Sequence, residues 1–233
     1  MTLTLKNNLS VFVGIPCLSR HDKYKSYLPS VLSHLKNQKC SVEIREPYIT
    51  PDHMGKFNVG QPDRLHAIAG RMNDIVEQFM KTKCSHVFID DMDVEVPSDC
   101  IETLLKHDVD VASGVYPSHN FESVGAMSFG RMVKDHPCGL YRPRGWDSMK
   151  NTVWGEDDAW SGGTGCVLIK RRVFEQHNPR ITALRFNKDN DCSLDTLFWK
   201  RCHDMGFSTR VDANILCGHL ALYPLKKRKK WLK

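Results

Sequence analysis

The strongest signal for a metal site in the sequence is the group of Asp90, Asp91 and Asp93. These carboxylates directly follow the run 85–89 (Ser-His-Val-Phe-Ile), which is typical of a buried strand. Carboxylates so close together repel one another unless a cation neutralises them, and Mg²⁺ or Mn²⁺ prefers such oxygen ligands together with substrate phosphates. The pattern predicts a divalent-metal site, although Asp-x-Asp at a strand end also occurs in solvated turns.

Three further segments carry residues that suit ligand binding. His219 follows the last apolar run, and a neutral imidazole is a common metal ligand, although a histidine here is more often structural. Residues 161–165 (Ser-Gly-Gly-Thr-Gly) would let the backbone approach a ligand or simply form a turn, and they lack the lysine of a Walker motif. Residues 156–158 (Glu-Asp-Asp) lie between Trp154 and Trp160, which suits either a sugar-binding loop or a solvated acidic loop.

Hydrophobic periodicity predicts the elements that position these residues. The predicted strands span 9–15, 41–44, 85–89, 108–115, 126–133, 164–170 and 207–216; the predicted helices span 24–37, 63–81, 97–106 and 193–205, and 47–62 is expected to be a loop. This βαβ alternation predicts an α/β fold with a mostly parallel central sheet flanked by helices. In such sheets ligands bind at the carboxyl ends of the strands, which is where the acidic cluster is expected.

One stretch resembles a known family. Residues 88–117 (FIDDMDVEVPSDCIETLLKHDVDVASGVYP) are similar to the nucleotide-sugar-binding core of GT-A-fold glycosyltransferases, in particular small family 2-like enzymes. The shared pattern is an apolar strand, Asp-x-Asp, a proline, a helix, and a strand that ends near a glycine and an aromatic residue. The resemblance extends to 9–17 (LSVFVGIPC), 161–175 and 193–219, and it implies a single GT-A (Rossmann-like) domain.

The resemblance also implies a metal and a donor site. Asp91 and Asp93 would hold Mn²⁺ or Mg²⁺, His219 would add a further ligand, and the metal would bind the diphosphate of a nucleotide-sugar donor. The implied donor-binding residues are Pro16 at the end of the first strand, Arg71 and Asn73 on the helix before the cluster, Asp90 and Asp91 in the cluster, and Gly163 in the glycine-rich segment. Met72 splits the family's Arg-Asn pair, so a solvated helix face is the alternative reading of Arg71.

Asp195 is the residue that the resemblance assigns as general base. It matches the aspartate of the Glu-Asp pair that starts a helix facing the acceptor, with Leu194 in place of the glutamate. The positive end of the helix dipole should keep an aspartate in this position ionised. Residues 156–158 hold the alternative base.

Composition sets the size and the class of the protein. With 233 residues, 41% of them hydrophobic and 26% charged, the chain is typical of a globular protein with one domain over 1–225, comprising a donor half of about 1–115 and an acceptor half of about 116–225. The tail 226–233 carries six of the 33 basic residues and no acid, which leaves the body neutral with 27 of each sign. Such a tail suits a polyanionic surface, either DNA or an anionic membrane, or it is a solvated terminus.

Cysteine usage and hydropathy indicate the compartment. The nine cysteines are odd in number and include no CxxC pair, which favours reduced thiols in a cytoplasmic protein, with peripheral attachment to a membrane surface as a possibility. The longest apolar stretch, 9–18, is too short to be a transmembrane segment, which needs about 20 residues. The clustered cysteines and histidines near the C-terminus lack the spacing of a structural zinc site.

The function predicted from these features is metal-dependent transfer of a sugar from a nucleotide-diphosphate sugar to a hydroxyl acceptor. The acceptor stays open among a glycolipid, a polysaccharide, a protein and a modified DNA base. One alternative is a nucleotidyltransferase of similar core fold, although residues 14–20 do not form the glycine-rich basic loop that usually follows the first strand of such enzymes. The other is a non-catalytic module that binds nucleic acid or membrane through the tail.

Overall fold

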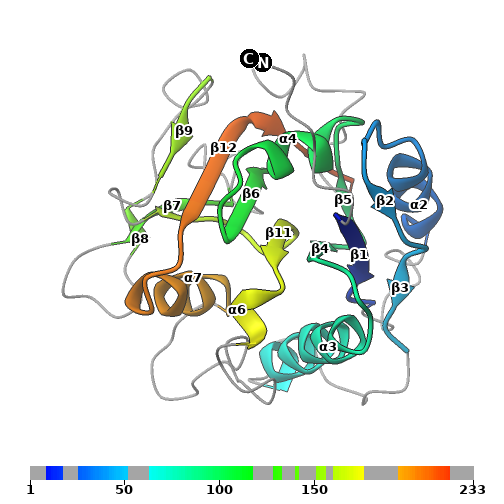
Figure 1. Cartoon of the computed structure of the whole chain (residues 1–233), viewed down its shortest axis with the longest axis horizontal. Coiled ribbons are helices and arrows are strands. Elements are labelled where there is room, and N and C mark those ends of the chain that lie inside the picture. The colour runs from blue at the N-terminus through cyan, green and yellow to red at the C-terminus, as the bar shows by residue number, and fades with distance from the viewer. Residues whose placement is uncertain are drawn as a thin grey trace.

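The centre of the protein is an eight-stranded sheet in which β2-β1-β4-β11-β6-β12-β9 lie side by side and β3 pairs with β1 (Figure 1). The computed structural model describes residues 9–17, 26–51, 63–117, 128–132, 140–141, 151–155, 160–175 and 194–220. The strands of the central sheet are β1 (Ser10–Ile15), β2 (Glu43–Ile44), β3 (Tyr48–Ile49), β4 (His86–Asp90), β6 (Val111–Val115), β9 (Val153–Trp154), β11 (Cys166–Lys170) and β12 (Thr209–Leu216).

The direction of the strands confirms the predicted mostly parallel sheet. Strand β1 is parallel to β2, β3 and β4, and β12 is parallel to β6, whereas β11 runs antiparallel to both β4 and β6 and β9 runs antiparallel to β12. Because β11 is reversed, its first residue, Cys166, pairs with the last residue of β4, Asp90. The start of β11 therefore lies at the same edge as the carboxyl ends of the parallel strands.

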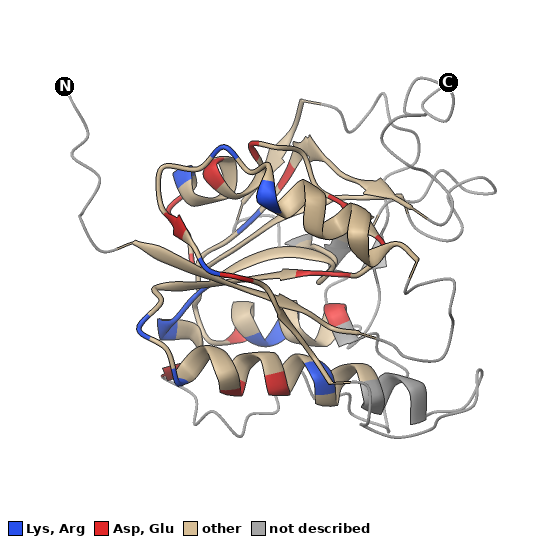
Figure 2. Ribbon diagram, turned by 90° about the vertical axis from the view of Figure 1, so that its right-hand side faces the viewer, with Lys and Arg blue, Asp and Glu red and all other residues tan. Residues whose placement is uncertain are grey.

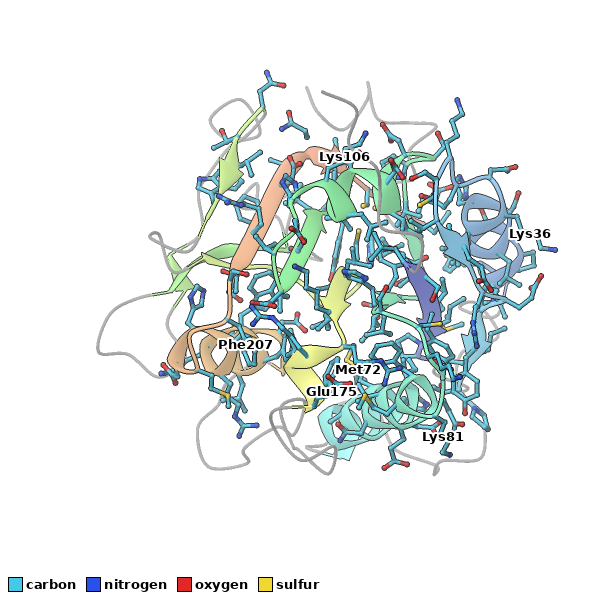
Figure 3. The ribbon with its side chains drawn as sticks, in the orientation of Figure 1. Lys36, Met72, Lys81, Lys106, Glu175 and Phe207 are labelled. Carbon is cyan, nitrogen blue, oxygen red and sulfur yellow. The ribbon has the colours of Figure 1, made fainter. Side chains whose placement is uncertain are left out.

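Helices cover both faces of the sheet, as Figure 2 shows with acidic and basic residues interspersed along them. The helices are α2 (Leu28–Lys36), α3 (Asp63–Met80), α4 (Cys100–Lys106), α6 (Arg172–Glu175) and α7 (Leu194–Asp204). Buried side chains of α2 and α4 form one core with one face of the sheet, and those of α3, α6 and α7 form a second core on the other face. Met72 of α3 lies on the side of that helix turned to the sheet, whereas Lys36 of α2 points outward (Figure 3).

Two small sheets complete the described part of the structure. One consists of β10 (Trp160–Ser161), β7 (Gly130–Met132) and β8 (Leu140–Tyr141), all antiparallel. The other joins β5 (Val94–Glu95) to β13 (Gly218–His219). This second pair brings the chain just after the acidic cluster against the chain that follows β12, and so it builds one side of the candidate site.

The main predicted elements are confirmed, with two corrections. The strands predicted over 9–15, 85–89 and 207–216 and the helices predicted over 63–81 and 193–205 match β1, β4, β12, α3 and α7 to within two residues at each end. The predicted loop 47–62 is wrong at β3, which pairs with Gly14 and Ile15.

The helix predicted to begin at Pro97 begins instead at Cys100. The side chain of Gln38 explains the delay, because its Nε2 donates to the Pro97 carbonyl at 2.7 Å and its Oε1 accepts from the Ile101 amide at 3.2 Å. The Gln38 side chain thus takes the Ile101 amide that would otherwise bond to the Pro97 carbonyl in a helix, and the residues before α4 form a turn in which the Cys100 amide donates to the Pro97 carbonyl at 3.1 Å. None of the described helices combines the length and the apolar character that crossing a bilayer requires.

Candidate active site

The acidic cluster forms a turn at the carboxyl end of β4, fastened on two sides. Within the turn the Val94 amide donates to the Asp91 carbonyl at 2.9 Å. The Asp91 amide donates to the Gly165 carbonyl at 3.1 Å, and the Leu220 amide donates to the Asp93 carbonyl at 2.7 Å. The turn is therefore held between the entry of β11 and the residue after β13.

His219 and Asp93 form the closest pair of candidate metal ligands. The imidazole Nε2 of His219 lies 3.2 Å from Asp93 Oδ2, with the two side chains 7% and 14% exposed. Two ligands at right angles on an octahedral Mg²⁺ are about 2.9 Å apart, given metal–oxygen distances of 2.0–2.1 Å. The spacing of this pair fits adjacent ligands of a divalent cation, with the carboxylate as the ligand type that Mg²⁺ or Mn²⁺ prefers.

Asp91 adds a second acidic group next to this pair. Its side chain is half-buried. Burial, followed by the charges of Asp93 and Asp195, raises the pKa of Asp91 well above its ordinary value. Such crowding of negative charge is what a bound cation offsets, so the electrostatics of the turn suit a metal site.

The protein side chains alone do not surround a metal. Within the described ranges, no three histidine, cysteine, aspartate or glutamate side chains are already arranged to hold an ion. Mg²⁺ usually takes only one or two carboxylates and completes its shell with water and substrate phosphates. The residues present fit a metal that binds together with a diphosphate better than a resident structural metal.

Tyr116 is a member of the site that sequence reasoning missed. Its ring stacks on the His219 ring with centroids 6.5 Å apart and an interplanar angle of 16°, and its hydroxyl accepts from the Gly165 amide at 3.1 Å. Burial, followed by the charges of Asp91 and Asp195, raises the pKa of Tyr116 well above its ordinary value, so the phenol stays protonated. One signal was available in the sequence, because Tyr116 directly follows a predicted strand and therefore lies at the ligand-binding edge.

Asp195 lies at this edge as well, in the first turn of α7. Its charge acts on both Asp91 and Tyr116, which places it beside the acidic turn. Asp195 Oδ1 accepts a hydrogen bond of 2.6 Å from the hydroxyl of Thr164, a residue only 3% exposed just before β11. Thr164 is the second residue that sequence reasoning missed, and its role depends on a contact between two segments far apart in the chain.

Asp90, the first residue of the acidic cluster, differs from Asp91 and Asp93 in its burial. Its side chain is wholly buried, and neither carboxyl oxygen has a hydrogen-bond partner among the described residues. Burial, followed by the nearby Cys166, raises the pKa of Asp90 well above its ordinary value. A donor contact from Asp90 remains a prediction, and its burial means that such a contact would need the turn to move.

The other predicted donor residues lie on three different elements. Pro16 is buried just after β1, and the next amide, that of Cys17, donates to Thr50 Oγ1 at 2.8 Å. Arg71, on α3, is only 2% exposed, and Asn73 on the same helix is half-buried. Donor contacts from Pro16, Arg71 and Asn73 remain predictions.

Gly163 lies directly against the newly found tyrosine. A Cβ atom at Gly163 would overlap the Tyr116 hydroxyl and lie 2.8 Å from Cζ of that ring. The glycine-rich segment is therefore built around Tyr116, and a donor contact from Gly163 remains a prediction. The alternative base segment 156–158 and the basic tail 226–233 lie outside the described residues.

Comparisons with known proteins show the fold. No protein-family model matches the chain, and no curated protein matches its sequence. Among solved structures, A197 from STIV is 15% identical with a TM-score of 0.52 over 90% of this chain and 84% of that one. The CMP:2-keto-3-deoxy-manno-octonic acid synthetase complexed with CTP is 15% identical with a TM-score of 0.50 over 89% and 90%.

A third similar structure is S. aureus TarS, which is 12% identical with a TM-score of 0.53. It covers 95% of this chain, which spans only 38% of the length of TarS. At these identities the similarity concerns the fold alone. It confirms the predicted α/β fold, a mostly parallel sheet flanked by helices of the GT-A-like, Rossmann type.

Proposed function

We propose that this protein is a metal-dependent glycosyltransferase that uses a nucleotide-diphosphate sugar. The observation that carries the proposal is the convergence of Asp91, Asp93, His219 and Asp195 at the carboxyl edge of the sheet. The 3.2 Å contact of His219 with Asp93, together with the effect of Asp93 and Asp195 on the pKa of Asp91, supports this convergence. Open α/β sheets bind ligands at this edge, and clustered carboxylates suit a cation with a diphosphate.

In the proposed reaction Asp91, Asp93 and His219 would hold Mn²⁺ or Mg²⁺. That metal would neutralise charge on the diphosphate as it leaves. Asp195 would accept the proton of the acceptor hydroxyl. The acceptor oxygen forms a bond to the anomeric carbon, the bond from that carbon to the diphosphate breaks, and the diphosphate departs with the bonding electrons.

A nucleotidyltransferase is the second candidate function. One comparison favours it: the synthetase of similar fold is, by its description, complexed with CTP, so the fold accommodates a nucleoside triphosphate in that protein. The same acidic turn would suit a metal-bound triphosphate. The two candidates share nucleotide-related transfer and differ in the group that is transferred.

The tail 226–233 points to the acceptor, although its structure is not described. Six basic residues among eight, on a body with 27 acidic and 27 basic residues, would attract a polyanionic acceptor or an anionic membrane surface. We propose that the tail acts on the acceptor side, since the acidic turn would serve the donor. A cytoplasmic location would suit these partners.

Melting temperatures and hydrolysis together test the proposal. The purified chain would be heated with Mn²⁺ and a panel of UDP-, GDP- and ADP-linked sugars, and with the nucleoside triphosphates, each with and without EDTA. A glycosyltransferase predicts a metal-dependent rise in melting temperature and slow hydrolysis with one nucleotide-sugar class. Stabilisation by a triphosphate alone would favour the nucleotidyltransferase, and no response to any nucleotide would contradict both enzymes.

A further inference from the structure

We infer that Thr164 is a positioning residue for Asp195, and that it sets the rate of the transfer step without contacting the donor. The inference rests on the proposed function, in which Asp195 is the general base. It adds a residue that neither the Asp-x-Asp pattern nor the helix start points to.

The hydrogen bond between the two side chains has the length of a charge-assisted bond. Thr164 Oγ1 lies 2.6 Å from Asp195 Oδ1. Hydroxyl groups donating to an ionised carboxylate make bonds of 2.5–2.7 Å, shorter and stronger than neutral ones. Because Thr164 is only 3% exposed, water hardly competes for its hydroxyl, while Asp195 itself is partly exposed.

The backbone of Thr164 is fixed by its two glycine neighbours. The Gly165 amide donates to the Tyr116 hydroxyl and the Gly165 carbonyl accepts from the Asp91 amide, both at 3.1 Å. A Cβ atom at Gly163 would overlap the Tyr116 hydroxyl, and one at Gly165 would lie 2.8 Å from it. The segment therefore fits one path between Tyr116 and the acidic turn.

The backbone of Asp195 is equally fixed, by the buried face of α7. Phe198 and Trp199 have no exposed surface, and Cys202 is 3% exposed in the same core. With both backbones held, the hydrogen bond from the Thr164 hydroxyl fixes the position of one carboxylate oxygen of Asp195.

The hydrogen bond from Thr164 matters because Asp195 lies next to the acidic turn. Thr164 adjoins Gly165, whose carbonyl accepts from the Asp91 amide, so its hydrogen bond holds the Asp195 carboxylate beside the acidic turn. An acceptor hydroxyl placed there would meet a carboxylate of fixed orientation. Thr164 keeps its own proton, and the proton of the acceptor goes to Asp195 as in the proposed reaction.

Four variants test the inference: Thr164→Val, Thr164→Ser, Asp195→Asn and the double variant Thr164→Val with Asp195→Asn. The assay is hydrolysis of the donor found in the nucleotide-sugar panel, with water as acceptor, at saturating Mn²⁺. Thr164→Val should lower kcat by about 10- to 100-fold, the range expected for a misplaced catalytic group, and leave KM within about twofold. Thr164→Ser keeps the hydroxyl and should restore most of kcat.

Thr209→Val is the matched control. Thr209 is also buried, at 1% exposure, but it begins β12 at the opposite edge of the sheet, and its hydroxyl makes only a 3.5 Å contact with His203. Its kcat should match that of the wild type. If Thr164→Val does not fold, Thr164→Ala takes its place, with the same expected loss of kcat at unchanged KM.

The outcomes separate the inference from the proposed function. Two results would overturn the positioning role alone. One is a wild-type kcat in Thr164→Val. The other is a double variant in which Thr164→Val lowers the kcat of Asp195→Asn by the same factor as it lowers that of the wild type. Full activity of Asp195→Asn would also overturn that role, because no base would remain to be positioned. If the wild-type protein neither binds nor hydrolyses any nucleotide sugar, the proposed function is wrong, and the role inferred for Thr164 is wrong as well.

Discussion

The imidazole of His219 contacts Asp93 across the pair of short strands β5 and β13, with 3.2 Å between Nε2 and Oδ2. In the strand register His219 lies opposite Val94, the residue directly after Asp93. The backbone adds a second link, because the Leu220 amide donates to the Asp93 carbonyl. The last described strand therefore holds the acidic turn in place, so that a metal bound at the turn would also stabilise the packing of this strand.

Replacing Asp93 by alanine should abolish the Mn²⁺-dependent rise in melting temperature with the donor nucleotide. His219→Ala should reduce that rise without abolishing it, because Asp91 and Asp93 remain. His107→Ala is a matched control, since His107 pairs with Asp212 at 2.9 Å in a second, partly buried His–Asp contact. The control should lower the melting temperature but keep the full response to Mn²⁺; an unchanged response in Asp93→Ala would contradict the metal assignment.

Asp91→Asn should not destabilise the protein in EDTA. Burial and the charges of Asp93 and Asp195 oppose ionisation of Asp91, so a neutral amide of the same shape removes unfavourable energy. The same variant should lose its stabilisation by Mn²⁺ with nucleotide. Differential scanning calorimetry with EDTA and with Mn²⁺ measures both effects, and a lower melting temperature in EDTA would show that Asp91 has a structural role instead.

Gly165→Ala should disrupt the site. The added Cβ would lie 2.5 Å from Asp91 Oδ2 and 2.8 Å from the Tyr116 hydroxyl, so the turn or the tyrosine must move. Overpacking of this kind costs about 1–3 kcal/mol. Gly155→Ala is the control, because its Cβ would meet the guanidinium of Arg210, the far end of a flexible side chain. Urea unfolding and nucleotide binding measure the two losses, and wild-type behaviour of Gly165→Ala would mean that Asp91 is not confined as described.

Below neutral pH, His86 should make the protein less stable. Burial and the nearby Lys170 lower the pKa of His86 from 6.5 to about 4, so the unfolded chain binds a proton that the folded protein does not. Stability should therefore fall as the pH drops from about 6.5 to 4, by up to about 3 kcal/mol from this residue. His86→Asn, which can still contact the Ser85 hydroxyl, should flatten that part of the profile in urea unfolding at several pH values. An unchanged slope would assign the loss to other groups.

Removing the residues after Tyr223 should leave donor hydrolysis unchanged and weaken binding to a polyanion. Displacement of counterions by several lysines and an arginine makes such binding fall steeply with salt. Fluorescence anisotropy with labelled duplex DNA, and co-sedimentation with vesicles containing phosphatidylserine, compare the two sources of negative charge. Equal binding by the full and the shortened chain at 50 and 200 mM salt would exclude a role for the tail.

The position of the acidic turn could be predicted from the sequence because it depends on local signals. The apolar run before Asp90 fixes where β4 ends, and the alternation of strands and helices fixes which edge of the sheet that end occupies. The same reasoning would have found Tyr116 at the end of β6. The late start of α4 could not be predicted, because it depends on the side chain of Gln38, which comes from a different part of the chain.

The contacts that complete the candidate site lie beyond local signals. Strands β5 and β13 have two residues each, too few to show a period, so periodicity does not predict the contact of His219 with Asp93. Only the family resemblance implied that these two residues come together. The hydrogen bond of Thr164 with Asp195 joins the entry of β11 to the start of α7, two elements that periodicity predicts separately. Periodicity gives their extent but not the distance between them.

The reversed strand β11 has a consequence for how the chain folds. Strands β4 and β6 are close in sequence, yet in the sheet each pairs with β11, which is synthesised much later. Until β11 inserts, both strands keep an unpaired edge, the kind of surface that promotes aggregation. Joining the two sides of the sheet is therefore a late, long-range event, and pairings of this kind slow folding. A fragment that ends at Val115 lacks the strand that joins β4 to β6, so the first half of the chain depends on the second half for its own sheet.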